Sequence, residues 1–593
     1  MGEMMIPHSC REPDKNLKIG RIIEVDGTHI KAELEKSIDE LNRVYNSEVY
    51  SIGQFGSILK SYFGNRLLFM YVTKLRLKSE IEAENGNYIP PSEDSRILEA
   101  DLFGEGQWEL HKEPELCSEY HLEFERGIST YPLPLQELYL TTSVELKSIY
   151  ECNDRHAIKI GTYVGTGTIP CFANIDELFS KHTAILGSTG SGKSATVAAI
   201  IHAISTYVPG VDNKNNLRPW HPHIIIFDPH NEYNKAFPQA QRLVSDEGTL
   251  KLPYWLLNLK ELTDLIIGKS EFQATSQINI LKTALIDCRK EGAKIISSKY
   301  DKISVDSPIP FSLELLIQKI KADMPPQASK QDKHLSILNK IDALRNDVRL
   351  NFLMDNWSSN TDTIKDIITQ FINYEKPLKV VDISGIPNDV AGIVSSTIAR
   401  LLFMYKLWET PEERVQNPIL LVCEEAHRYV PNRGEAEYTA AQDAIKRVAK
   451  EGRKYGLGLL LVSQRPSEIE PTVLSQCNSW LVLRLTNSED QSYVLKFLPD
   501  SLTSLGKILP SLRRREAIFI GQAASIPSRI LINELRREQL PQSNDISFVE
   551  GWSNPPIDNN KIQKVVDRWR IQLRGEFEGA SSDTDTSEEV GEK

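Results

Sequence analysis

The sequence predicts an α/β protein, with a mostly parallel sheet flanked by helices and preceded by a small β-barrel. Near-continuous apolar runs, such as those at 183–186 and 419–423, alternate with longer helical patterns, which is typical of a buried parallel sheet. Apolar residues recur at three- and four-residue spacing between 256 and 360, which predicts a helical insertion. Apolar and polar residues alternate around Asp26–Gly27, which predicts a hairpin. An irregular α+β cap is the alternative to the barrel.

The composition is that of an ordinary globular chain. Of 593 residues, 40% are hydrophobic and 25% charged. No apolar run reaches about 18 residues, so we expect no membrane-spanning helix and no membrane partner. The N-terminus lacks a basic segment followed by an apolar one, so no signal peptide is expected. Seven scattered cysteines without a C-x-x-C pair favour a reducing, cytoplasmic location over disulfides or structural zinc.

The charge balance restricts how the chain could contact nucleic acid. The net charge is −12, whereas a free-standing nucleic-acid binder usually has a basic surplus. Any such contact must therefore be local, as in the lumen of a ring. The last residues, SSDTDTSEEVGEK (581–593), are polar, acidic and without aromatic side chains, which predicts a disordered tail.

We expect seven segments along the chain. They are a flexible N-terminus (1–15), the N-terminal β-barrel (16–150), the first part of the α/β core (151–255), the helical insertion (256–360), the second part of the core (361–535), a C-terminal extension with a helix (536–575) and the acidic disordered tail (576–593).

A glycine-rich turn follows the first buried strand of the core. Residues 187–194 fit the pattern G-x-x-x-x-G-K-[ST], which binds phosphate, and a chance match is the alternative. Its glycines let successive N–H groups point at an anion, and Lys193 adds a charge at the β- and γ-phosphates. The Ser194 hydroxyl is a ligand for Mg²⁺. The predicted ATP contacts are Gly187, Ser188, Thr189, Gly190, Ser191, Gly192, Lys193, Ser194 and Ala195.

A second apolar run ends in two carboxylates. ILLVCEE (419–425) resembles a Walker B strand, which delivers carboxylates to the metal and to the attacking water. The first carboxylate is usually Asp, but here it is Glu424, which can still reach Mg²⁺ through water. Glu425 is the better candidate for polarising the water. A strand ending in solvated charges is the alternative.

Two further strands of the core end in polar residues. Asp228, in FDPHNEY, is expected to hold the metal or its waters, with help from Glu232, and a turn-forming Asp-Pro is the alternative. Gln464 is expected to sense the γ-phosphate, although it could be a plain strand-end residue. Ligands bind beyond the carboxyl ends of parallel strands, so these side chains are expected at one edge of the sheet.

With these motifs in place, the chain resembles the HerA-family ATPases, of the same broad motor class as FtsK. The resemblance rests on HTAILGSTGSGKSATVAAII, FDPHNEY, LLVCEEAHRYVP, AKEGRKYGLGLLLVSQRP and AIFIGQA, with LKIGRIIEVDG similar to that family's N-terminal barrel. It spans about residues 16–533. The departures are HNE, where a glycine often follows the His, and the acidic tail.

The resemblance implies a RecA-like P-loop ATPase core, a homohexameric ring and ATP-driven movement of double-stranded DNA through its pore. It also implies a partner at the N-terminal barrel, either a NurA-like nuclease or a sirtuin-like or other effector of phage defence. The main alternative is a nucleotide-controlled scaffold that assembles and activates an effector. A secretion ATPase is a third possibility.

Ring motors complete each site with an arginine from the next subunit, because charge on the γ-phosphate builds in the transition state. Arg453 is the first choice and Arg447 the second, although either could form structural salt bridges. Arg465 and Arg484 are weaker candidates. For pore contacts with DNA, we predict Arg428 and Arg433, in the loop after the Walker B strand.

Overall fold

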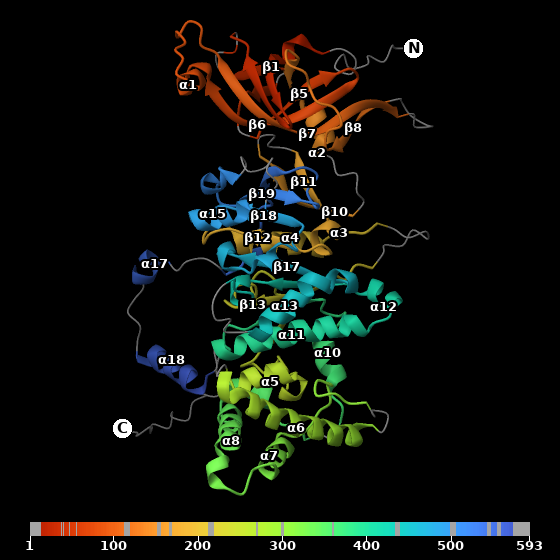
Figure 1. Ribbon diagram of the computed structural model, residues 1–593, viewed down its shortest axis with the longest axis vertical. Helices are drawn as coiled ribbons and strands as arrows, with labels where there is room; N and C mark the ends of the chain where they lie inside the picture. The colour runs from red at the N-terminus through yellow and green to blue at the C-terminus, as the bar shows by residue number, and fades with distance from the viewer. Residues whose placement is uncertain are drawn as a thin grey trace, which may run out of the picture. The chain divides into compact units, whose positions relative to one another are not determined.

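The computed structural model in Figure 1 gives the architecture of the chain. The structure describes residues 13–36, 38, 41–46, 48–54, 56–111, 119–150, 156–164, 169–210, 219–268, 271–297, 302–358, 361–432, 439–497, 506–542, 547–553 and 559–572. Most of the predicted flexible N-terminus, the acidic tail at 576–593 and Arg433 lie outside these residues.

The chain divides into two compact units. Unit 1 comprises Met1–Trp220 and Leu460–Arg536, and unit 2 comprises His221–Leu459 and Arg537–Lys593. The chain returns from unit 2 to unit 1 within strand β17 (Leu457–Ser463). The seven-segment division given by the sequence stays a prediction.

Unit 1 begins with a closed six-stranded barrel. Its strands are β1 (Lys18–Asp26), β2 (His29–Leu34), β5 (Ile58–Phe63), β6 (Arg66–Leu77), β7 (Arg96–His111) and β9 (Glu137–Leu140). They run in the order β2-β1-β9-β5-β6-β7, and β7 pairs with β2 to close the barrel. The β1–β2 turn contains Gly27, whose φ of 57° favours glycine. The predicted barrel is confirmed, and the alternative of an irregular cap is wrong.

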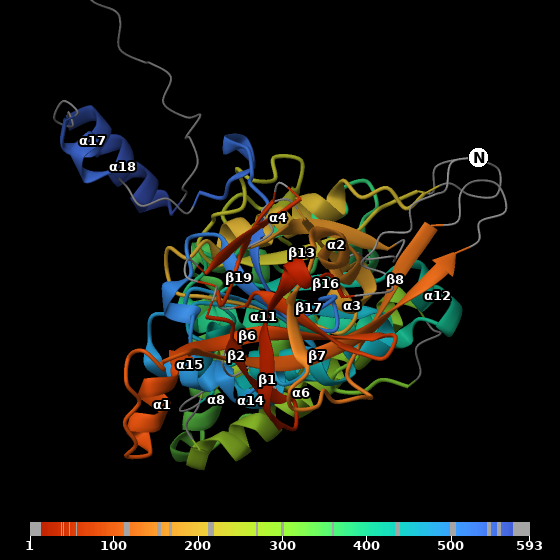
Figure 2. The same cartoon turned by 90° about the horizontal axis from the view of Figure 1, so that it is seen from above.

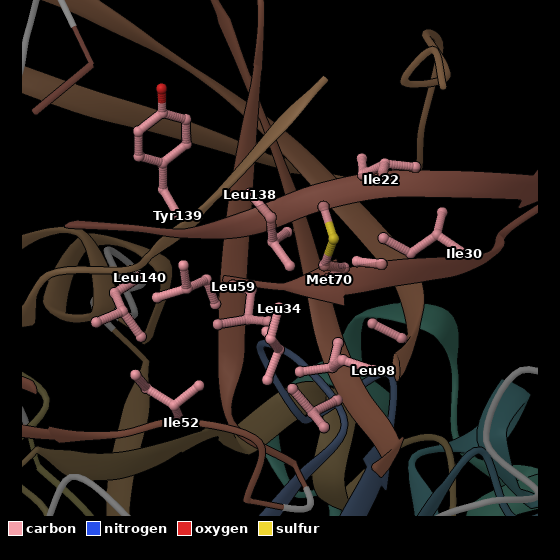
Figure 3. Packing of buried hydrophobic residues seen from close by; sticks show 14 of the residues in the cluster. Ile22, Ile30, Leu34, Ile52, Leu59, Met70, Leu98, Leu138, Tyr139 and Leu140 are labelled. Atoms are coloured by element: carbon pink, nitrogen blue, oxygen red, sulfur yellow. The ribbon is translucent and has the colours of Figure 1, made fainter. Parts of the chain in front are cut away.

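The barrel is filled by aliphatic side chains that alternate inward along its strands. Figure 3 shows Ile22, Ile30, Leu59, Leu98 and Leu138 gathered from five of the strands. The remaining barrel-region elements are β3 (Asn42–Tyr45), β4 (Glu48–Ser51), α1 (Lys78–Glu84), β8 (Glu119–Arg126) and α2 (Ser143–Tyr150). Strand β8 pairs with the second half of β7, and the two form a long antiparallel ribbon (Figure 2).

A second sheet in unit 1 holds the glycine-rich turn. Its order is β11-β10-β20-β19-β18-β12-β17, with β12 parallel to both β17 and β18. The elements are β10 (Ala157–Tyr163), β11 (Pro170–Asn174), α3 (Ile175–Phe179), β12 (Thr183–Leu186), α4 (Lys193–Ser205), α14 (Pro471–Leu474), β18 (Ser479–Leu483), α15 (Ser488–Leu495), β19 (Glu516–Gly521) and β20 (Ser528–Ile532). The strands from β18 to β11 pair antiparallel.

Unit 2 has four parallel strands in the order β16-β13-β15-β14. They are β13 (His223–Asp228), β14 (Gln241–Val244), β15 (Leu378–Asp382) and β16 (Ile419–Cys423). Every residue of β13, β15 and β16 is buried, which explains their near-continuous apolar sequences. The predicted α/β class is confirmed in both units.

The predicted helical insertion is present in unit 2 (Figure 1). It contains α5 (Leu259–Ile266), α6 (Glu271–Ile296), α7 (Leu313–Ala322), α8 (Asp332–Arg345) and α9 (Asn351–Met354), followed by α10 (Ile364–Ile372). Helices α6, α7 and α8 pack on one another. The other helices of unit 2 are α11 (Asn388–Trp408), α12 (Pro411–Gln416), α13 (Thr439–Glu451), α17 (Phe548–Ser553) and α18 (Asn559–Ile571).

Helix α11 is the one helix in the described part of the chain that is long and apolar enough to cross a membrane, over Val390–Trp408. The sequence analysis expected no such helix. In the structure 72% of its most apolar stretch is buried, and it packs on α5 and α13. This burial is that of a core helix.

A buried histidine begins β13. The His223 ring lies 4.8 Å from the Tyr374 ring, and neither of its nitrogens has a hydrogen-bond partner among the described residues. Burial, together with the charges of Lys379, His221 and Lys406, lowers the pKa of His223 to about 4. The folded protein therefore holds this ring neutral.

We expect stability to fall on acidification from pH 6.5 to pH 4. Over this range His223 binds a proton in the unfolded chain but not in the folded chain. The contribution of His223 to the free energy of unfolding is therefore complete above pH 6.5 and is lost as the pH falls towards 4. The loss attributable to His223 is about 3 kcal/mol. His223→Phe should flatten this part of the profile in melting temperatures measured against pH. His156→Gln, at an exposed position in unit 1, is the control, and an unchanged slope in His223→Phe contradicts the assignment.

Candidate active site

The glycine-rich turn joins β12 to α4 in unit 1. Gly190 and Gly192 have φ values of 73° and 102°, in the left-handed region that favours glycine. The N–H of Gly187 donates to the Ser463 carbonyl at 3.2 Å, and that of Ser188 to the Arg484 carbonyl at 2.8 Å. Ser463 ends β17 and Arg484 directly follows β18, so the turn is fixed to the strands on both sides of β12.

The start of α4 suits a bound phosphate. Gly192 is its N-cap and supplies no side-chain hydrogen bond to the first N–H groups of the helix. Those groups and the positive end of the helix dipole favour an anion. Lys193 is the first helical residue, with its ammonium 3.4 Å from the Ser188 carbonyl, and Ser194 and Ala195 follow in the same turn. The buried Ser191 hydroxyl has no hydrogen-bond partner among the described residues.

The structure brings Gln464 to this turn. The Thr189 hydroxyl donates to the Gln464 Oε1 at 2.6 Å. Gln464 directly follows β17, the strand that pairs with β12. A side chain in this position can respond to whatever occupies the turn, although its predicted role as a sensor stays a prediction.

Sequence reasoning missed Arg515, which also holds the turn. Its N–H donates to the Ser191 carbonyl at 3.1 Å, and its φ of 70° is in the left-handed region. Its guanidinium donates to the Ile532 carbonyl and lies 3.4 Å from Glu534. The contact with the turn is made by backbone atoms, so no side-chain pattern could have indicated it.

Unit 2 carries the predicted carboxylates at the ends of two paired strands. β13 ends at Asp228, and β16 is followed by Glu424 and Glu425, with Phe227 opposite Cys423 in the parallel register. Asp228, Glu424 and Glu425 are only 1%, 6% and 8% exposed, respectively. Three carboxylates so removed from water need hydrogen bonds or a cation.

Asp228 is committed to its own loop. Its carboxylate accepts backbone N–H groups from His230 at 3.2 Å, Glu232 at 3.1 Å and Tyr233 at 3.0 Å. Burial raises the pKa of Asp228, and these three donors act in the opposite direction. Asp228 therefore organises the turn at 228–233, and metal ligation by Asp228 stays a prediction.

Tyr233 contacts Glu424 and was missed by the sequence analysis. Its hydroxyl donates to the Glu424 carboxylate, and both side chains are buried. Burial and the adjacent carboxylate raise the pKa of Tyr233 well above its ordinary value, so the hydroxyl stays a donor. The only signal in the sequence was a tyrosine that closes FDPHNEY.

Glu425 has a strained backbone and a carboxylate oxygen that accepts no hydrogen bond. Its φ and ψ are 51° and 52°, a conformation that is uncommon outside glycine and often found at active sites. Its Oε2 accepts no hydrogen bond from the described residues and lies 3.3 Å from the His427 Nδ1. These features suit a carboxylate that takes up a water molecule.

The predicted arginines differ in their contacts. Arg447 stacks on Phe403, with its guanidinium carbon 4.5 Å from the ring centroid, and it lies 3.7 Å from Glu451. Arg453 is exposed in the turn before β17, and among the described residues no side-chain partner is recorded for it.

The remaining predicted arginines are the weaker finger candidates Arg465 and Arg484 and the pore candidate Arg428. Arg465 pairs with Glu468 at 2.8 Å, and Arg428 lies 3.5 Å from the His230 ring. The Arg484 Nε is buried without a hydrogen-bond partner among the described residues.

The described residues contain no group of three His, Cys, Asp or Glu side chains that could hold a metal ion by themselves. Mg²⁺ is usually held by one or two carboxylates or a hydroxyl together with substrate phosphates and water. Ser194, Glu424 and Asp228 supply oxygen donors of this kind.

A phosphate-binding turn at a helix N-terminus, with paired carboxylates after buried parallel strands, defines a P-loop ATPase. Residues 158–402 match the family model described as "Helicase HerA, central domain". These findings support a HerA-type ATPase, so the predicted resemblance to that family and the predicted RecA-like P-loop core are confirmed.

Several known proteins are similar to this chain. The chain is 28% identical over 427 residues to the DNA double-strand break repair helicase HerA of Saccharolobus solfataricus, covering 71% of this chain and 76% of that protein. It is 26% identical over 434 residues to a probable helicase of Methanocaldococcus jannaschii, covering 73% and 77%. The solved structure of VirB4 from Thermoanaerobacter pseudethanolicus gives a TM-score of 0.45 at 16% identity, covering 65% of this chain and 99% of that one.

We expect Gly187→Ala to damage the turn. A Cβ at this position would lie 2.7 Å from the Ser191 Oγ and 2.8 Å from the Leu483 Cβ, so the backbone must shift. Overpacking of this kind costs about 1–3 kcal/mol. Melting temperature and affinity for an ATP analogue should both fall. Gly551→Ala, where a Cβ meets nothing within 4 Å, is the control, and a Gly187→Ala protein with unchanged affinity contradicts the expectation.

Proposed function

We propose that this protein is an ATP-hydrolysing ring motor, a homohexamer that translocates or unwinds double-stranded DNA together with a partner nuclease or effector. The environment of Glu425 is the observation that supports hydrolysis of ATP in addition to binding of ATP. The backbone of Glu425 is strained, its side chain is buried, and one carboxylate oxygen accepts no hydrogen bond among the described residues. The relatives named as DNA-repair helicases support DNA as the substrate.

Each predicted residue has a distinct role in this proposal. The turn at 187–195 holds the phosphates of ATP, with Lys193 at the β- and γ-phosphates. Ser194, Glu424 and Asp228 hold Mg²⁺ directly or through its waters, and bound Mg²⁺ neutralises charge that develops on the phosphates. Glu425 polarises the attacking water, and Gln464 responds to the γ-phosphate.

The charge of the barrel supports a protein partner there. Residues 16–150 contain 23 Asp and Glu but only 14 Lys and Arg, which accounts for most of the net charge of −12. Such a surface repels the phosphates of DNA and favours a partner with a basic face. A NurA-like nuclease or a sirtuin-like or other defence effector is proposed to dock on it, in the cytoplasm.

Two substitutions separate binding from hydrolysis. Lys193→Ala should abolish ATP binding, whereas Glu425→Gln should keep ATP binding and lower hydrolysis at least about 100-fold. Both are measured as ATPase rate with and without duplex DNA, and as affinity for an ATP analogue. If Glu425→Gln still supports full activity of the partner, the scaffold function replaces the motor.

The contribution of one subunit to the next is tested through the two arginines. Arg453→Ala should lower ATPase activity by about 10³-fold and leave nucleotide binding intact, because a transition-state arginine is lost. Mixing it with Lys193→Ala should restore activity, since the second variant supplies an intact Arg453 to the first. Arg447→Ala, which removes the stacking on Phe403, should mainly lower stability. Failure of the mixture to regain activity places Arg453 outside this role.

A further inference from the structure

We propose that Tyr233 is a positioning residue that holds Glu424 in the orientation needed for metal binding. The proposal rests on the function above and adds a part that the motifs do not contain. The Walker B strand usually presents an aspartate, and this chain presents a longer side chain. The hydrogen bond from Tyr233 restricts the additional rotamer freedom of the longer Glu424 side chain.

The contact is direct and buried. The Tyr233 hydroxyl donates to Oε1 of Glu424, across 191 positions of sequence and within unit 2. The Tyr233 ring also stacks on Phe237, with the two planes 10° apart. The tyrosine is therefore fixed by packing at its ring and by a hydrogen bond at its hydroxyl.

The backbone that carries Tyr233 is itself fixed. Asp228 accepts the Tyr233 N–H at 3.0 Å and two further N–H groups of the same turn. From the C-terminal extension, the Gln542 N–H donates to the Glu232 carbonyl at 2.8 Å. The position of the hydroxyl is thus determined by the turn that follows β13, and this gives Asp228 a purpose besides metal ligation.

The chemistry explains why a glutamate benefits from such a contact. Glutamate has one more rotatable bond than aspartate, so it loses more rotamer freedom when it is held in one orientation. A carboxylate offers about four lone-pair sites, so one hydrogen bond from a phenol leaves capacity for a metal or its water. Tyr233 can therefore orient Glu424 without replacing the metal.

Unit 2 contains a matched control. Tyr429 is also buried, in the segment after β16 that carries Glu424, and its ring lies 5.9 Å from the Phe227 ring. Its hydroxyl has no hydrogen-bond partner among the described residues. Tyr429→Phe removes the same atom from a similar environment without touching a carboxylate.

The test is the Mg²⁺ dependence of nucleotide binding, measured with a fluorescent ATP analogue. Tyr233→Phe should need about tenfold more Mg²⁺ for half-maximal tight binding, because a hydrogen bond to a charged group is lost. Its affinity in EDTA should equal that of the wild type, and Tyr429→Phe should match the wild type throughout. An unchanged Mg²⁺ requirement in Tyr233→Phe, or an equal loss of affinity in EDTA, overturns the proposal.

A second comparison tests the positioning role if Tyr233→Phe alone is unstable. Glu424→Asp shortens the carboxylate and withdraws it from the tyrosine, so Tyr233→Phe should add no further change in this background. Additive effects of the two substitutions would falsify the positioning role. Failure of the positioning role leaves the proposed function standing, because that function is tested separately by Lys193→Ala and Glu425→Gln.

Discussion

The site depends on how the phosphate-binding turn is held at the end of β12. Within the turn, the glycines supply conformational freedom and the Ser191 N–H donates to the Ser188 carbonyl at 3.2 Å. The position of the turn comes from hydrogen bonds to neighbouring segments, among them Gly187 N–H to Ser463 at the end of β17, Ser188 N–H to Arg484 after β18, and Arg515 N–H to Ser191. The pairing of β12 with β17 and β18 therefore comes first, and the geometry around Lys193 follows from it.

In unit 2, hydrogen bonds between segments likewise determine the positions of the carboxylates. Asp228 uses its oxygens to close a turn, and that turn presents Tyr233 to Glu424. Glu425, by contrast, keeps an oxygen that accepts no hydrogen bond among the described residues and has a strained backbone. Neighbouring acidic residues of similar burial thus have different hydrogen-bond partners.

The sequence predicted those parts of the fold that are coded locally. The turn at 187–194, the barrel hairpin at Asp26–Gly27 and the ends of β13 and β16 each follow from a contiguous pattern. The contact of Tyr233 with Glu424 joins residues far apart in sequence, and Arg515 holds the turn through its backbone. Neither leaves a pattern in a single sequence. The stacking of Arg447 on Phe403 could not be predicted either, because helices α13 and α11 come into contact only in the folded chain.

The division of unit 1 between two stretches of chain has a consequence for biosynthesis. Ser188, which bonds to Thr486, is translated 298 residues before that partner. Until residues 460–486 leave the ribosome, β12 has neither of its neighbouring strands, and the phosphate-binding turn has nothing to hold it. The parallel strands of unit 2 are complete by then, so the acidic strand ends are assembled on the nascent chain before the turn. A chain released early would carry carboxylates without a phosphate cradle, and so could not engage nucleotide.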